Sequence, residues 1–183
     1  MSQMHRALLF MTTSLFLTGM AHAEMRLSSS DIAEGEMMDR DQVFAGFGCN
    51  GNNLAPSLSW SGAPKETKSY IVTAYDPDAP TGSGFWHWSV FNVPASVTEF
   101  PEGVGSIAEP LPVGAIPARN DFSQNGFGGA CPPEGQSHRY VFTVFAMPQE
   151  ALPIDETASG ALVGFMANTT SLARATITAT YSR

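Results

Sequence analysis

Short apolar runs recur along the chain and alternate with segments rich in turn-forming residues. The last run has the period of two of a half-buried strand, with Ala175, Ile177, Ala179 and Tyr181 on one face and threonines on the other. The chain contains 17 glycines and 13 prolines, which favour turns between such runs. This pattern predicts a mostly β domain. The runs that predict its strands are residues 25–28, 58–60, 70–75, 86–93, 140–147 and 175–181.

One segment, residues 157–174, has helical spacing. Its residues Leu162, Phe165, Met166 and Thr169 recur at intervals of three and four. Asp155 lies just upstream, where it could cap the first turn. Residues 94–124 show little periodicity, and long ordered loops of this kind are often functional. We therefore expect one late helix and a long connection in a β domain.

The first 23 residues have the pattern of a secretory signal peptide. Arg6 supplies an early positive charge, residues 7–17 are apolar, and Ala21-His22-Ala23 ends the segment. The alternative is an uncleaved anchor, but the apolar run is shorter than the roughly 20 residues that span a membrane. We expect cleavage after Ala23, a periplasmic or secreted product without a transmembrane anchor, and one domain over residues 24–183.

The net charge limits the classes of partner, and the two cysteines are interpreted by the redox state of the compartment. The formal net charge is −8, which disfavours nucleic acid and anionic membrane surfaces as partners because both attract Lys and Arg. Two cysteines, Cys49 and Cys131, are present. In an oxidising compartment such a pair more often forms a disulfide than remains as thiols. We expect a bridge that pins two glycine-rich loops together.

Residues 76–88 combine a stiff acidic turn with an aromatic strand. The strand at 70–75 runs into Asp76-Pro77-Asp78-Ala79-Pro80, and Trp86-His87-Trp88 opens the next strand. Proline fixes φ and removes a backbone donor, so the turn is stiff. Such a turn beside aromatic side chains suits one rim of a small-anion pocket. Alone, it would be only a turn whose acids cap nearby N–H groups, and the tryptophans would be core residues.

A second rim is formed by Gly126-Phe127-Gly128-Gly129-Ala130-Cys131-Pro132-Pro133 and by His138-Arg139-Tyr140 at the start of a strand. Together, the two rims resemble the phosphatidylethanolamine-binding protein family, in particular its bacterial Raf-kinase-inhibitor-like branch. The resemblance extends in the expected order over nearly all residues after Ala23. The supporting matches are Phe47-Gly48-Cys49-Asn50-Gly51, Pro56-Ser57-Leu58-Ser59-Trp60 and Ser159-Gly160-Ala161-Leu162-Val163-Gly164.

The resemblance implies a large central, antiparallel-rich sheet packed with a smaller sheet, plus a helix in the C-terminal half. It also implies a small cavity for phosphate or a phosphorylated head group, and kinase- or protease-inhibitor-like action on a protein partner. The match departs at Trp88, where many eukaryotic relatives have a second histidine. The residues that fall on family pocket positions are Asp76, Trp86, His138 and Tyr140, with walls shaped by Pro80, Pro132 and Pro133.

Strand alternation refines this assignment. Side chains two residues apart share a face, so Trp86 and Trp88 should line the pocket while His87 points away. His138 and Tyr140 should point the same way. The N–H groups of Gly128 and Gly129 could approach an anion closely because no Cβ intervenes.

The acids of the turn are expected to differ in role. Asp78 is expected to cap the turn. Asp76 is an unusual neighbour for a phosphate, unless it shares a proton with His138 or meets a ligand ammonium such as that of phosphoethanolamine.

Two classes of function remain open. The first is a non-catalytic binding protein without a cofactor, which takes a small anion and acts on a protein partner. The second is a thiol hydrolase with Cys131 as nucleophile, His138 as base and Asp76 as orienting acid; a disulfide at Cys131 would remove the nucleophile. A metal site is not predicted, because only His87 and His138 follow the leader and no zinc-type spacing occurs. The sequence leaves the oligomeric state open, a dimer included.

Overall fold

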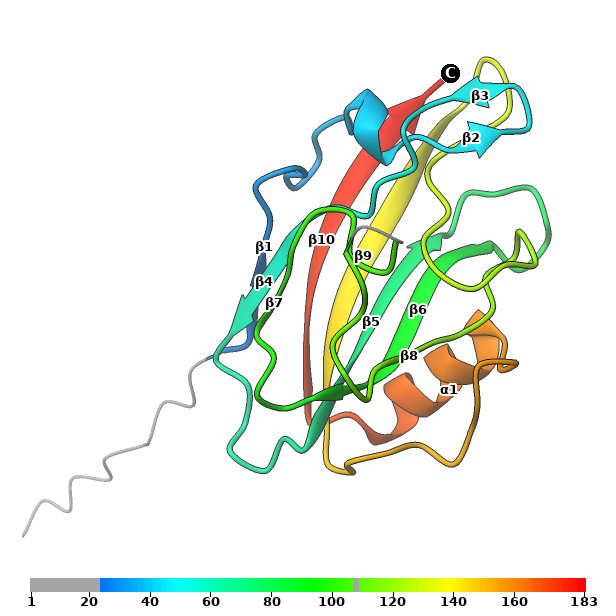
Figure 1. The fold of residues 1–183 in the computed structure, drawn as a ribbon. Helices are drawn as coiled ribbons and strands as arrows, with labels where there is room; N and C mark the ends of the chain where they lie inside the picture. The colour runs from blue at the N-terminus through cyan, green and yellow to red at the C-terminus, as the bar shows by residue number, and fades with distance from the viewer. Residues whose placement is uncertain (1–23, 107–108) are drawn as a thin grey trace, which may run out of the picture.

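The structure, a computed structural model, describes residues 24–106 and 109–183. The predicted signal peptide lies outside these residues. Figure 1 shows a twisted sheet with smaller elements on both faces. The elements are β1 (Arg26–Ser28), the 3-10 turn η1 (Arg40–Gln42), β2 (Ala45–Gly46), β3 (Cys49–Asn50), β4 (Leu58–Ser61), β5 (Ser69–Asp76), β6 (Phe85–Pro94), β7 (Glu99–Phe100), β8 (Ile116–Pro117), β9 (Ser137–Met147), α1 (Gly160–Thr170) and β10 (Ala173–Ser182).

Five strands form the large sheet in the order β10-β9-β5-β6-β8, and every neighbouring pair is antiparallel. The central strand β5 is buried on both faces, which explains why its residues are mostly apolar without alternation. The β10 alternation is confirmed, because Ala175, Ile177 and Ala179 are all buried. Each of the six runs predicted as strands contains a strand. Sequence reasoning missed the two-residue strands, which are too short to show a period.

A smaller sheet, β1-β4-β7, covers one face of the large sheet. Trp60 of β4 packs edge-on against Tyr70 of β5 and Phe100 of β7, with ring centroids 5.4 Å apart in both pairs. Aromatic pairs in this geometry contribute beyond their buried area. The expected packing of a large sheet with a smaller one is confirmed.

The helix α1 covers the opposite face, but not with the residues that suggested it. Leu162 and Phe165 are 41% and 65% exposed, whereas the buried residues are Gly160, Val163, Gly164 and Ala167. A Cβ at Gly160 would lie 2.5 Å from Trp86, so glycine allows the helix to approach the indole. The buried face is therefore a small-residue face. No helix in the two described segments is long and apolar enough to cross a membrane.

The helix also begins later than expected. Ser159, and not Asp155, is the N-cap, and its hydroxyl accepts a hydrogen bond from the N–H of Leu162. Asp155 instead accepts hydrogen bonds from Thr157 in the preceding turn. The expected cap was thus one turn too early.

The Cys49–Cys131 disulfide is present, with Cα atoms 6.0 Å apart. It joins β3 to the loop before β9. Figure 1 shows the β2–β3 hairpin beside the end of β10. The bridge therefore pins two loops at the end of the sheet where the candidate site lies.

Candidate functional site

A cavity of about 330 Å³ lies at this end of the large sheet. It is bounded by the turn after β5, the start of β6, and the loops that carry the disulfide. Its lining residues are Phe47, Asp76, Ala79, Pro80, Thr81, Phe85, His87, Phe122, Cys131, Pro132, Pro133, His138 and Arg183. Of the ten residues expected to bind ligand, the cavity thus brings together Asp76, Pro80, Pro132, Pro133 and His138.

Two of the polar lining residues, Asp76 and His138, form a buried pair. Asp76 ends β5 and His138 begins the neighbouring β9, so the sheet brings residues distant in sequence together. Nδ1 of His138 lies 2.7 Å from Oδ2 of Asp76, and the side chains are 4% and 3% exposed. Of the two arrangements expected for Asp76, the structure has the one with His138.

The remaining polar atoms of this pair are also occupied. Oδ1 of Asp76 accepts hydrogen bonds from the N–H groups of Asp78 and Ala79, at 2.8 and 3.0 Å. Nε2 of His138 lies 2.8 Å from Oε1 of Gln136. The pair is therefore fixed in position, and it can hold a proton between a carboxylate and an imidazole.

Asp78 ties the turn to β9 from outside the cavity. Its carboxylate accepts two hydrogen bonds from the Arg139 guanidinium and one from the Arg139 backbone. The guanidinium lowers the pKa of Asp78 to about 2. The expectation that Asp78 is structural agrees with these contacts, although its main partner is an arginine.

A β-bulge in β6 overturns the expected orientation of the aromatic strand. Ala74 of β5 pairs with Trp88, while the next residue, Tyr75, pairs with Trp86. His87 is the extra residue, and a one-residue insertion reverses the faces beyond it. His87 therefore lines the cavity, and the prediction that it points away is wrong.

Neither tryptophan lines the cavity. Trp86 turns toward α1, where its ring fills the space at Gly160 and Gly164. Trp88 is fully buried in the core between the two sheets, with its ring 5.7 Å from that of Phe100. The assignment of Trp86 and Trp88 to the pocket wall is corrected: Trp88 is a core residue, whereas Trp86 is half-buried against α1.

His87 is held as a neutral ring. It is 4% exposed, and its Nδ1 lies 2.7 Å from the carbonyl oxygen of Gly128. A carbonyl only accepts, so Nδ1 carries the proton and Nε2 is left as an acceptor. Burial lowers the pKa of His87, because the charged imidazolium is poorly solvated there.

Gly128 and Gly129 support the site without facing it. The N–H of Gly128 donates to the carbonyl of His87 at 2.9 Å, and that of Gly129 donates to Oδ1 of Asn53 at 2.7 Å. Neither donor is free for an anion, so that expectation is corrected. A Cβ at Gly128 would collide with the Phe122 ring, and one at Gly129 would lie 2.5 Å from the carbonyl oxygen of Gln42. Glycine is needed here for close packing.

Tyr140 also lies behind the cavity wall. It is 2% exposed, and its ring meets the His87 ring edge-on at 5.1 Å. Burial raises the pKa of its phenol, which therefore stays neutral. Tyr140 positions His87 and is not itself a lining residue.

The aromatic wall comes from residues that sequence reasoning did not select. Phe122 stacks on Phe44 at 4.1 Å and meets Phe85 edge-on at 4.7 Å. Phe47, 77% exposed, lies 5.7 Å from Phe122 at the outer edge. Its φ of 51° is unusual for a residue with a bulky side chain. Phe122 lies within the long connection of residues 94–124, and no local pattern singles out Phe47 or Phe85 as lining residues.

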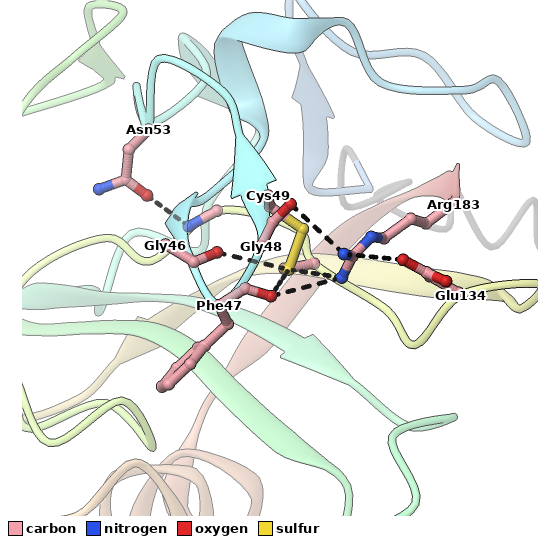
Figure 2. Close-up of a disulfide and its surroundings, with 9 residues drawn as sticks. Gly46, Phe47, Gly48, Cys49, Asn53, Glu134 and Arg183 are labelled. Carbon is pink, nitrogen blue, oxygen red and sulfur yellow. Dashed lines mark hydrogen bonds and ion pairs between the residues drawn. A yellow bond between two sulfur atoms is a disulfide. The ribbon is translucent and has the colours of Figure 1, made fainter.

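Cys131 and Arg183 complete the lining. Figure 2 shows the disulfide beside the Arg183 guanidinium, which lies between the carbonyls of Phe47 and Gly48 and the carboxylate of Glu134. Because Cys131 is bonded to Cys49, it has no thiol to act as a nucleophile. In residues 24–106 and 109–183, no group of three or more His, Cys, Asp or Glu side chains could hold a metal ion.

The fold and the site together define the class of protein to which this chain belongs. The family model described as phosphatidylethanolamine-binding protein matches residues 28–182. The chain belongs to this family.

Particular relatives come from bacteria. YbcL of Escherichia coli is 50% identical over 179 residues, which cover 96% of this chain and 98% of that protein. YbhB of the same organism is 49% identical over 158 residues, covering 86% and 100%. The crystal structure of YbcL, described as a new member of the mammalian family, has a TM-score of 0.84 at 51% identity and covers 88% of this chain and 99% of its own.

More distant structures share the fold. A homologue from Chlamydia trachomatis has a TM-score of 0.72 at 24% identity and covers 88% of this chain and 99% of its own. The overall fold is thus retained at low sequence identity.

Proposed function

We propose that this protein is a non-catalytic binding protein whose cavity takes a small anion, phosphate or a phosphorylated head group such as phosphoethanolamine. The observation that carries the proposal is the buried Asp76–His138 pair in a cavity walled by prolines and phenylalanines. Every oxygen of Asp76 that could repel an anion already accepts a hydrogen bond from the protein. Both ring nitrogens of His138 are likewise engaged, so the cation that the described lining offers to an anion is the Arg183 guanidinium, without an unpaired carboxylate.

We further propose that the protein is exported and acts on a protein partner as an inhibitor or modulator. Export is supported by the leader pattern of residues 1–23, and the partner by the resemblance to the Raf-kinase-inhibitor-like branch. N-terminal sequencing of the protein from fractionated cells tests export. The expected product begins at Glu24 outside the cytoplasm, and a cytoplasmic product that begins at Met1 would contradict it.

The binding function is tested by NMR titration with inorganic phosphate and, separately, phosphoethanolamine. We expect either ligand at millimolar concentration to shift ring resonances of His138, His87 and Tyr140, and His138→Ala to abolish the shifts. Unchanged spectra with both ligands would overturn the anion pocket.

A titration of thiols tests the non-catalytic reading. The unreduced mature protein is expected to contain no reactive thiol, because both cysteines are in the bridge. One or two reactive thiols would restore Cys131 as a candidate nucleophile.

A further inference from the structure

Among the ionisable side chains that line the cavity, some have a buried partner of opposite charge and one does not. Asp76 faces His138 at 2.7 Å, so any positive charge on this imidazole is matched by a buried carboxylate. His87 is neutral, because burial lowers its pKa and its Nδ1–H is used by Gly128. Among the described lining residues, this leaves Arg183 as the one permanent cation without a buried acidic partner.

Arg183 is held loosely. Its guanidinium nitrogens lie 3.4 Å from the carbonyl oxygen of Phe47, 3.3 Å from that of Gly48 and 3.3 Å from Oε1 of Glu134 (Figure 2). These distances are at or beyond the long end of the hydrogen-bond range. The Glu134 side chain is 84% exposed, and an ion pair with so solvated a partner contributes little. The guanidinium can therefore exchange this partner at small cost.

The contacts that remain come from the disulfide-bonded loop. Phe47 and Gly48 immediately precede Cys49, and a nitrogen of Arg183 lies 3.8 Å from Sγ of Cys131. The bridge thus fixes the carbonyls that seat the guanidinium at the edge of the cavity.

Building on the anion-binding function proposed above, we propose that Arg183 is the residue that selects an oxyanion in this cavity, exchanging Glu134 for two oxygens of the ligand. The planar guanidinium matches two oxygens of a phosphate group, which a lysine ammonium does not. The ligand class that follows is an oxyanion with at least two free oxygens, such as inorganic phosphate or a phosphomonoester. Glu134 acts as a competitor for the site.

The experiment is calorimetric titration of the mature, disulfide-bonded protein with inorganic phosphate at low ionic strength. We expect Arg183→Gln to weaken binding about tenfold, as for the loss of a charge-assisted hydrogen bond. Arg183→Lys should give an intermediate loss, and Glu134→Gln should tighten binding about twofold to fivefold, by the weak coupling of exposed ion pairs.

Arg174→Gln is the matched control. It removes the same charge from the far end of β10, about 30 Å away at the usual rise per strand residue. Binding should change less than about twofold, because charges about 30 Å apart interact only weakly across water even at low ionic strength. Near-UV circular dichroism checks that each variant keeps its tertiary structure.

The outcomes separate this inference from the function on which it rests. If Arg183→Gln binds phosphate like the wild type while His138→Ala does not bind, Arg183 is not the selecting residue and the pocket stands. Equal losses in Arg183→Gln and Arg174→Gln would show a general charge effect and also overturn the inference. If the wild type fails to bind phosphate, this inference is wrong, and if it also fails to bind phosphoethanolamine, the anion pocket is wrong as well.

Discussion

Asp76 and His138 are 62 residues apart in sequence, yet their side chains share a 2.7 Å hydrogen bond and are almost completely buried. Removing one partner of a buried pair leaves the other without compensation, which is more costly than the pair is stabilising. The carboxylate also closes the turn after β5. The pair is thus part of both the site and the fold.

Asp76→Ala is expected to lower the free energy of unfolding by about 3 kcal/mol, because it leaves Nδ1 of His138 and two backbone N–H groups unpaired in a buried place. Urea denaturation measures this change. Asp78→Ala is the control in the same turn, with an expected loss of about 1 kcal/mol or less, since its ion pair with Arg139 is partly exposed. Equal losses in the two variants would contradict a special role for the buried pair.

His87 is expected to titrate below pH 6.5 and to be neutral at pH 7 with the proton on Nδ1. Because its folded pKa is below the unfolded value, the unfolded state binds more protons as the pH falls. His87 therefore contributes stability that is complete above about pH 6.5 and decreases as the pH falls below it. Nitrogen-15 NMR of the ring reports both protonation and tautomer. A titration midpoint above 6.5, or a proton on Nε2, would contradict this arrangement.

Loss of the disulfide is expected to lower stability by about 4 kcal/mol, since the bridge closes a loop between residues 82 apart in sequence. The test is the free energy of unfolding of the Cys49→Ser/Cys131→Ser variant. Phosphate binding should also weaken, because the loop that seats Arg183 is released. Unchanged affinity in the double variant would show that the loop holds its position without the bridge.

Gly164→Ala is expected to destabilise the protein by about 1–3 kcal/mol, because the new methyl group meets the Trp86 ring in a packed interface. On an exposed helix face the same change would stabilise by roughly 1 kcal/mol. The sign therefore reports which face is buried. Phe165→Ala, on the exposed face, should change stability by less than about 0.5 kcal/mol, and a larger loss would mean that this face is covered.

Local sequence patterns were sufficient to predict those elements whose residues lie in one continuous segment. The apolar run of β5 and the alternation of β10 show in any window of the chain, because burial on one or both faces sets the period. The helix was also predicted, but from residues that do not form its buried face. Its exposed Leu162 and Phe165 happen to fall at helical spacing, while its buried face consists of small residues.

The errors at the site arise from strand pairing and from contacts between segments that are distant in sequence. A bulge adds one residue to β6, and strict alternation then assigns His87 and Trp86 to the wrong faces. No local feature around His87 marks the bulge, since it arises from pairing with β5.

The glycine-rich loop predicts Gly128 and Gly129 as anion donors, and this prediction is wrong for a related reason. Their N–H groups are used by His87 and Asn53, which are distant in sequence.

The sequence by itself determined the mostly β architecture, the family resemblance, the expectation of a disulfide and the identities of Asp76 and His138, because these follow from local periodicity and from motifs that stay contiguous. Only the tertiary structure decided that His87 faces the cavity, that both tryptophans lie elsewhere, and that Phe47, Phe122 and Arg183 complete the wall. These placements depend on strand register and on contacts between distant loops, which no window of the sequence contains.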